Sequence, residues 1–169
     1  MISPKVVSDS NGQDEETRII FQDEQVFVIA DIKPDADHHY LVIPKEHIHT
    51  PKSLARQHLP LVRHMIDVAM RILDQRCFQG RPASELVKEY RLGFHWPPFH
   101  SIDHVHMHVL FPVSSIPLIQ KLAFRPGIGF MPVQSLLDRI EKLPDQSTCK
   151  KEQTLSEDAY GRSEDMDWS

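Results

Sequence analysis

The stretch "HSIDHVHMHVLFP", residues 100–112, places three histidines at alternate positions in an otherwise apolar run. In a β-strand, residues two apart point to the same face and are spaced by about 6.7 Å along it. His104, His106 and His108 are therefore expected on one face of a strand, and the apolar residues between them on the other. The alternation predicts a strand that separates a row of imidazoles from a hydrophobic core.

The regions on either side of this strand show the features of a single domain. With 169 residues and 40% hydrophobic composition, the chain can bury one sizeable core. We expect a disordered polar head over residues 1–17, a folded domain over residues 18–143 and a disordered tail over residues 144–169. The tail has seven acidic and three basic residues, so it carries most of the net charge of −5 and leaves the rest nearly neutral.

Composition also excludes some classes of partner. No apolar run approaches the roughly 20 residues of a membrane span, and no secretion signal is visible, so we expect a soluble intracellular protein without a membrane partner. The nearly neutral body lacks a basic surface for nucleic acid, so no nucleic-acid partner is expected. Cys77 and Cys149 have no paired spacing, which favours free thiols in a reducing compartment.

The rest of the folded region predicts an antiparallel sheet with two helices. Segments rich in β-branched and aromatic residues predict four further strands, at 18–21, 25–31, 38–44 and 90–95. Residues 53–76 have an apolar stripe at helical intervals, and Pro60 places the start of the regular helix only a few residues before it. Leu136, Leu137, Ile140 and Leu143 predict a short C-terminal helix. The fold class is therefore α+β, with about five antiparallel strands, one long helix and one short helix.

Three interpretations fit the row of imidazoles. Neutral imidazole is a common zinc ligand, although a structural site would need a fourth ligand from elsewhere. A central imidazole could instead attack phosphorus as a nucleophile while its neighbours orient it and stabilise charge. The third interpretation is a polar sheet face without chemistry.

Two segments add a resemblance to a known family. "ADIKPDADHHYLVIPKEHI", residues 30–48, and "RLGFHWPPFHSIDHVHMHV", residues 91–109, resemble the signature regions of the histidine-triad superfamily of nucleotide hydrolases and transferases. The His-x-His-x-His pattern followed by two apolar residues defines that superfamily. The resemblance covers residues 18–143; it is strongest to the HINT branch and more distant to the aprataxin branch.

The resemblance implies roles for the histidines and one serine. His106 matches the nucleophile that takes the nucleotidyl group. His104 and His108 match the neighbours that contact the phosphate and hold the tautomer of the nucleophile. Ser101 matches a serine at the scissile bond, although it could equally close the turn before the strand, and His39 matches a further histidine on the neighbouring strand.

It also implies a nucleotide-binding set. Asp31 matches a carboxylate that binds the ribose hydroxyls, and Ile29 and Ile32 match residues beside the base. Asp31 has an alternative duty, because an aspartate at a strand end often caps a turn. His95, in the aprataxin-like pattern "LGFH", is expected to approach the site.

The implied activity is hydrolysis of adenosine 5′-phosphoramidates to AMP and an amine, with a purine nucleotide phosphoramidate as substrate. This scheme requires no cofactor and no metal. HINT-type relatives imply a homodimer or a larger homo-oligomer, and the implied location is the cytoplasm, with the nucleus as a further location. Two alternatives stay open: a nucleotide-binding or scaffold protein with little turnover, and a zinc-dependent hydrolase.

One departure from the family concerns the base pocket. HINT-type relatives begin with a short helix that covers the adenine, where this chain has "MISPKVVSDSNGQDEETRII". The base pocket is therefore expected to be incomplete, weaker, or completed by another subunit.

Overall fold

The computed structural model describes residues 7–8, 14–15, 19–97, 102–127 and 129–144. Most of the expected polar head and acidic tail therefore lies outside the described residues. In the head, β1 (Val7–Ser8) and β2 (Asp14–Glu15) form a short antiparallel pair. The expected boundaries of the folded domain stay a prediction.

The main sheet has six strands in the order β3-β4-β5-β7-β6-β8, and every neighbouring pair is antiparallel. The strands are β3 (Ile19–Gln22), β4 (Val26–Ala30), β5 (His38–Pro44), β6 (Arg91–His95), β7 (Met107–Phe111) and β8 (Phe130–Pro132). The α+β antiparallel architecture is confirmed. The sheet has one strand more than expected.

The additional strand, β8, has only three residues and lacks the apolar alternation that predicts a strand from sequence. It forms because its backbone pairs with β6, where Gly93 lies opposite Pro132. A Cβ at Gly93 would lie 2.4 Å from the carbonyl oxygen of Met131 and 2.5 Å from the ring of Phe130. Glycine is therefore required at this position by close packing of β8.

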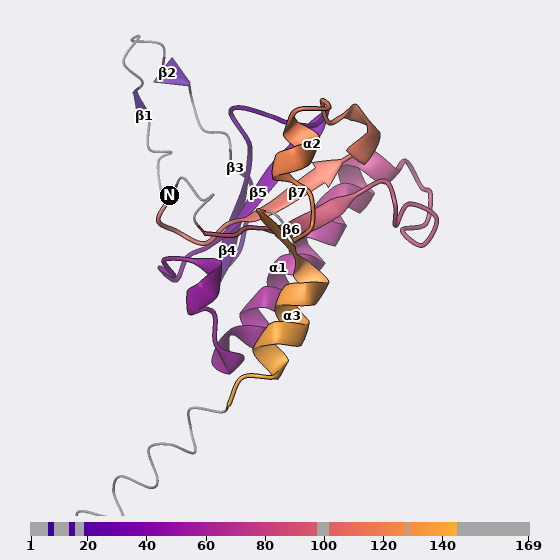
Figure 1. Cartoon of the computed structure of the whole chain (residues 1–169). Coiled ribbons are helices and arrows are strands. Elements are labelled where there is room, and N and C mark those ends of the chain that lie inside the picture. Colours follow the sequence, from indigo (N-terminus) through magenta and orange to yellow (C-terminus); the bar gives the residue numbers. More distant parts are fainter. Residues whose placement is uncertain (1–6, 9–13, 16–18, 98–101, 128, 145–169) are drawn as a thin grey trace, which may run out of the picture.

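Two helices cover one face of the sheet. In Figure 1, α1 (Leu59–Leu73) and α3 (Val133–Glu141) lie side by side below the strands, while the short α2 (Gln120–Ala123) lies at the other end of the molecule. Four short turns of other helix types complete the list: Pro51–Ser53, Arg56–His58, Asp74–Phe78 and Val113–Ser115. Both expected helices are confirmed.

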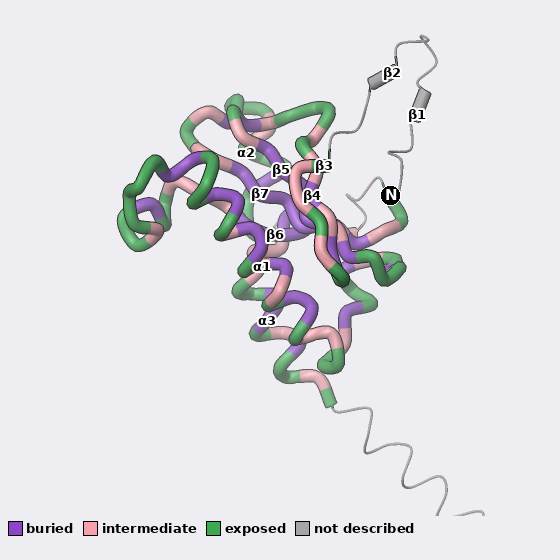
Figure 2. Tube along the Cα trace, turned by 180° about the vertical axis from the view of Figure 1, so that it is seen from behind, coloured by how far each residue is buried: buried purple, intermediate pink, exposed green. Residues whose placement is uncertain are grey.

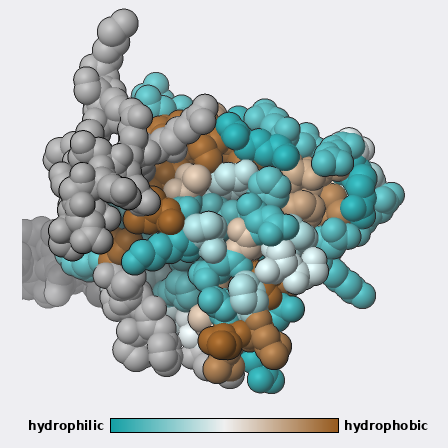
Figure 3. Space-filling view, turned by 90° about the horizontal axis from the view of Figure 1, so that it is seen from above, coloured by the Kyte–Doolittle hydropathy of each residue, from teal (hydrophilic) through white to brown (hydrophobic). Residues whose placement is uncertain are grey.

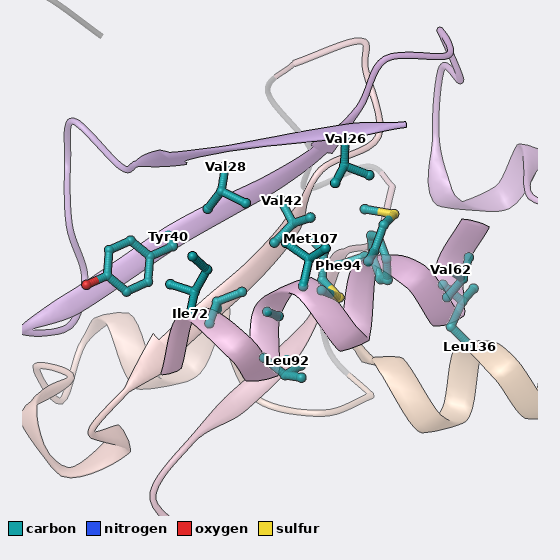
Figure 4. Packing of buried hydrophobic residues seen from close by; sticks show 14 of the residues in the cluster. Val26, Val28, Tyr40, Val42, Val62, Ile72, Leu92, Phe94, Met107 and Leu136 are labelled. Atoms are coloured by element: carbon teal, nitrogen blue, oxygen red, sulfur yellow. The ribbon is translucent and has the colours of Figure 1, made fainter. Parts of the chain in front are cut away.

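The start of α1 follows from its sequence. Pro60 occupies the first turn, where its missing amide hydrogen has no acceptor within the helix. The apolar stripe then packs against the sheet. Figure 4 shows Ile72 of α1 facing the strands that carry Val28, Val42 and Met107, and Val62 of α1 beside Leu136 of α3. In Figure 2 buried positions recur along α1 and gather in the strands at the centre of the molecule.

The histidine strand begins later than expected. β7 starts at Met107, so of the three histidines only His108 lies within a strand. The amide of Val105 bonds to the carbonyl of Ile48 at 2.7 Å instead of joining the sheet ladder. Val105, Met107 and Val109 all belong to the core beneath α1, as predicted. Burial does not alternate along β7, however, because His108 and Leu110 on the other face are buried as well.

The opposite face of β7 has its own small cluster. Leu110 packs there with Ala36, Ile116, Phe124 and Phe130, and this second cluster closes the sheet on the side away from α1. On the face seen in Figure 3, the described residues are mostly hydrophilic, with separate hydrophobic areas. Among the described helices, none is long and apolar enough to cross a membrane.

Candidate active site

A pocket of about 420 Å³ opens on the face of the sheet that bears His108. The loop after β4, the strand β5, the end of β6 and the segment entering β7 contribute its walls. Its lining residues are Ile29, Asp31, Ile32, Lys33, Asp35, His39, Leu41, His95, Ile102, His106 and His108. The volume lies in the range typical of small-molecule sites.

A chain of hydrogen bonds orders the imidazoles of β5 and β7. The backbone amide of Asp35 donates to His39 Nδ1 at 3.1 Å, and His39 Nε2 lies 2.9 Å from His108 Nδ1. Because an amide can only donate, His39 Nδ1 is an acceptor, so in the neutral ring Nε2 carries the proton. His39 then donates to His108, which leaves the proton of His108 on Nε2.

His108 Nε2 is therefore an N–H donor at a pocket wall. This atom is buried and has no hydrogen-bond partner among the described residues. An unpaired buried donor is unfavourable on its own, and a ligand oxygen would satisfy it. The hydrogen bonds from Asp35 through His39 thus leave His108 with an N–H donor on Nε2, at the wall of the pocket.

The tautomer of His106 is set separately, by the backbone. His106 Nδ1 lies 2.8 Å from the carbonyl oxygen of His104. A carbonyl only accepts, so Nδ1 carries the proton and the lone pair of the neutral ring is on Nε2. The His106 and His108 rings are 4.9 Å apart between centroids, so this lone pair belongs to a ring next to the His108 donor.

His104 takes a different position. Its Nε2 donates to the carbonyl oxygen of Pro44 at 2.8 Å, and its Nδ1 lies 2.8 Å from His47 Nδ1. The His104 ring therefore lines a smaller neighbouring cavity, which also contacts His95 and His106, and not the main pocket. His104 affects the main pocket through its backbone carbonyl, which accepts the hydrogen bond from His106 Nδ1.

His95 completes the imidazole cluster. Its ring lies 4.4 Å from that of His108 between centroids, at an interplanar angle of 77°. Phe124 and Phe130 contact both rings edge-on or tilted and shield them from water. This aromatic enclosure comes from the loop around α2 and from β8, neither of which was expected from sequence.

The enclosure determines the charge of the cluster. Burial lowers the pKa of His39 and His95, and it lowers that of His108 well below its ordinary value. Mutual repulsion among the imidazolium forms adds to the shift, while Asp31 and Asp35 partly oppose it at His39. These three rings are therefore neutral at pH 7, so they act as hydrogen-bonding groups and not as cations.

Asp31 caps the turn after β4 and also lines the pocket, while ribose binding by its carboxylate stays a prediction. Its Oδ1 accepts the amide of Lys33 at 2.9 Å, which is the turn cap, and its Oδ2 lies 3.4 Å from His39 Nε2. The carboxylate also lines the pocket, next to Ile29 and Ile32. The side chain of Ile32 is 62% exposed and forms part of the pocket mouth.

The structure brings most of the predicted residues to one pocket. His39, His95, His106 and His108 meet there with the expected nucleotide-binding set, and His104 lies beside it. Ser101 lies outside the described residues, so its role stays a prediction. Sequence reasoning missed Lys33, Asp35, Leu41 and Ile102. The breaker-rich "KPDAD" after Asp31 was the available signal for the first two, because a loop at a strand end often carries function.

One subset of the pocket also has metal-ligand chemistry. Single ligand atoms of Asp31, His39 and His108 lie within 4.8 Å of one another. The nitrogens of His39 and His108 face each other across a hydrogen bond, so a metal ion would have to displace the shared proton and break the relay. The donor set thus fits the relay better than it fits an ion.

Comparisons with known proteins agree with this arrangement. Residues 5–123 match the family described as scavenger mRNA decapping enzyme C-term binding. The chain is 34% identical over 133 residues to the adenosine 5′-monophosphoramidase HINT3 of Xenopus tropicalis, covering 78% of this chain and 83% of that protein. It is 39% identical over 132 residues to the bifunctional adenosine 5′-phosphosulfate phosphorylase/adenylylsulfatase HINT4 of Arabidopsis thaliana, covering 75% and 84%.

A solved structure shares the fold. The aprataxin ortholog Hnt3 from Schizosaccharomyces pombe superimposes with a TM-score of 0.54 at 20% identity, covering 78% of this chain and 69% of that one. The fold and the imidazole cluster define an α+β protein with a His-x-His-x-His pattern at a pocket. The chain belongs to the histidine-triad superfamily. Within it, the chain is similar over three quarters or more of its length to the two HINT proteins named above.

Proposed function

We propose that the protein hydrolyses adenosine 5′-phosphoramidates to AMP and an amine through a covalent adduct on His106. The observation that carries this proposal is the 2.8 Å bond from His106 Nδ1 to the His104 carbonyl, because it places the proton on Nδ1 and the lone pair, the nucleophilic site of a neutral imidazole, on Nε2. The similarity to the HINT3 phosphoramidase supports the same reaction.

The reaction takes place in two displacements at the α-phosphorus. His106 Nε2 attacks phosphorus, the P–N bond to the amine breaks, and its electron pair leaves with the amine nitrogen, which takes up a proton. Water then attacks the adduct and loses a proton to solvent, the bond from phosphorus to Nε2 breaks, and AMP leaves. Because His39, His95 and His108 are neutral at pH 7, none of these three rings is an imidazolium acid, and we assign the proton for the departing amine to solvent at the pocket mouth.

The remaining lining residues bind the nucleotide. His108 Nε2–H donates to an equatorial phosphate oxygen, where positioning and charge stabilisation dominate phosphoryl transfer. Asp31 accepts from the ribose hydroxyls, and the apolar Ile29 and Ile32 contact the base. Lys33, which sequence reasoning missed, adds a positive charge to the pocket lining.

The deciding experiment is intact-mass analysis after a brief incubation with adenosine 5′-phosphoramidate and a non-acidic denaturing quench. The wild type is expected to gain the mass of one AMP and to release amine. His106→Ala is expected to show no adduct and a rate at least about 10³-fold lower, because removal of a nucleophile abolishes the two-step path. A matched control is His64→Gln, which changes an α1 histidine that bonds to Asp23 outside the pocket.

Other outcomes separate the alternatives. AMP binding without adduct or amine release would contradict the proposal and favour a nucleotide-binding protein with little turnover. An adduct too short-lived to trap would leave the loss of amine release in His106→Ala as the supporting result. Activity that a chelator abolishes would contradict the metal-independent scheme and favour a zinc-dependent hydrolase.

We further propose that the protein acts as a homodimer or larger homo-oligomer in the cytoplasm, with the nucleus as a further location. The basis for the assembly is the resemblance of the sequence to HINT-type relatives. Cys77 is buried and forms no disulfide within the described part of the chain, which agrees with a reducing compartment. Light scattering of the purified chain and imaging of a fluorescent fusion test the two statements, and a monomer or a secreted fusion would contradict them.

A further inference from the structure

A second group of potential metal ligands lies outside the pocket. His47 and His49 belong to the segment that leaves β5, and Asp103 belongs to the segment that enters β7. One ligand atom of each lies within 4.8 Å of the others. All three residues are exposed, unlike the histidines of the pocket.

Hydrogen bonds already hold this group together. His49 Nδ1 donates to Asp103 Oδ2 at 3.0 Å, so a carboxylate and an imidazole from two separate segments are in direct contact. The rings of His47 and His49 meet edge-on, with 4.6 Å between centroids. The backbone bond from Val105 to Ile48 fixes the two segments against each other directly beside the group.

A further contact prepares His47 as a ligand. His104 Nε2 faces the Pro44 carbonyl and therefore carries a proton, so in the neutral ring His104 Nδ1 accepts. His47 Nδ1, at 2.8 Å, is then the donor in that bond, and the lone pair of neutral His47 is on Nε2. Metal-binding histidines characteristically donate their other ring N–H to a neighbour, and here that neighbour is His104.

Two imidazoles and one carboxylate form the ligand set of many zinc sites that keep positions for water. In a tetrahedral zinc site the ligand atoms are about 3.4 Å apart, given bonds of roughly 2.0–2.1 Å. Binding would displace the proton that His49 Nδ1 shares with Asp103 Oδ2. Because both side chains are exposed, that proton passes to solvent and the side chains can turn to close the remaining separations. Calcium and magnesium are poorer candidates, because both prefer oxygen ligands.

We propose that His47, His49 and Asp103 form a surface site for a divalent transition metal of the zinc class, with water completing the coordination. The ion would join the segment after β5 to the segment before β7. Asp103 is only three residues from His106, and the carbonyl of the intervening His104 positions the nucleophile. The site would thus stiffen the support of His106 without entering the pocket.

The test is calorimetric titration of the full chain, without an affinity tag, with zinc ions alone at neutral pH. Saturable binding of one ion per chain is expected. His49→Gln and Asp103→Asn are each expected to weaken zinc binding at least about tenfold. Loss of a group that only supports a metal ligand lowers metal affinity by about 10- to 100-fold, and loss of the ligand itself should lower it at least as much. His64→Gln is the matched control, since it alters another histidine that bonds to an aspartate, and it should leave affinity unchanged.

A second measurement tests whether zinc links the segment after β5 to the segment before β7. Zinc should slow hydrogen exchange of the Val105 amide in the wild type and leave it unchanged in Asp103→Asn, whose fold is checked by its melting temperature without metal. Absence of saturable binding at millimolar zinc would overturn the proposal. So would binding that His49→Gln leaves intact and that His39→Phe removes, because the ion would then lie in the buried pocket.

Discussion

One backbone amide and one backbone carbonyl decide which nitrogen carries the proton in the two central imidazoles. The Asp35 amide donates to His39 Nδ1, so the proton of neutral His39 is on Nε2 and is donated to His108 Nδ1. The proton of neutral His108 is therefore on Nε2. The His104 carbonyl accepts from His106 Nδ1 and so keeps the proton of His106 on that nitrogen. Backbone groups are suited to this duty because their donor or acceptor character does not change with pH.

Substitution of His39 tests the relay at this scale. His39→Phe removes both hydrogen bonds, so His108 is free to take the other tautomer, and we expect kcat to fall about 10- to 100-fold, the range for supporting groups. His39→Gln can restore a donor to His108 Nδ1 and should recover part of the loss. Nitrogen NMR shifts of His108 should show the tautomer change, which a merely structural role for His39 would not produce.

If His39→Phe leaves both kcat and the His108 nitrogen shifts unchanged, the relay does not control the tautomer. Circular dichroism and a melting curve for each variant separate that result from unfolding.

At the scale of elements, the close pairing of β6 with β8 depends on Gly93. Gly93 pairs with His108 on one side and with Pro132 on the other, and the Phe130 ring occupies the space where its side chain would lie. The same Phe130 encloses His95 and His108. The strand that sequence analysis missed is therefore the one that shields the imidazoles from water.

Gly93→Ala is the corresponding test. The new Cβ would overlap a backbone oxygen that cannot rotate away, so we expect the free energy of unfolding to fall by about 1–3 kcal/mol, as in other overpacked cores. Urea denaturation measures the change. Adding Phe130→Leu should recover only part of it, because Met131 remains in contact, and full recovery would assign the strain to the ring alone.

The elements differ in how well the sequence predicted them. The long helix and the strands β3 to β7 were predictable because each has several residues of apolar periodicity or β-branched composition. Residues 104–106 were expected in a strand, but Val105 bonds to Ile48 and not to a sheet neighbour. That choice depends on a loop 57 residues away in sequence, which no local pattern encodes.

At the scale of the whole molecule, burial of the imidazole cluster makes stability depend on pH. His39, His95 and His108 have pKa values below those of the unfolded chain, where histidine titrates near about 6.5. Below that pH the unfolded state binds more protons than the folded state, so the free energy of unfolding decreases as pH falls. Above it, these groups are neutral in both states and their contribution is fully present.

We therefore expect the melting temperature to be level above about pH 7 and to decrease between about pH 6.5 and pH 5. Asp35, whose pKa is raised by burial, acts in the opposite direction but over a more acidic range. A series of melting curves across these pH values tests the expectation. His39→Phe, which removes one of the three groups, should decline less steeply, and an equal slope would contradict the assignment.

The sequence by itself determined the α+β class, the long helix and the side of β7 on which the imidazoles lie, because these depend on periodicities that a few neighbouring residues carry. Tertiary structure decided which histidines meet. His39 and His108 are 69 residues apart and come into contact only because β5 and β7 pair in one register. The same packing made the rings neutral, assigned their protons and turned His104 away from the pocket toward His47. Those properties depend on burial and on backbone groups from distant segments, and no spacing within the motif specifies them.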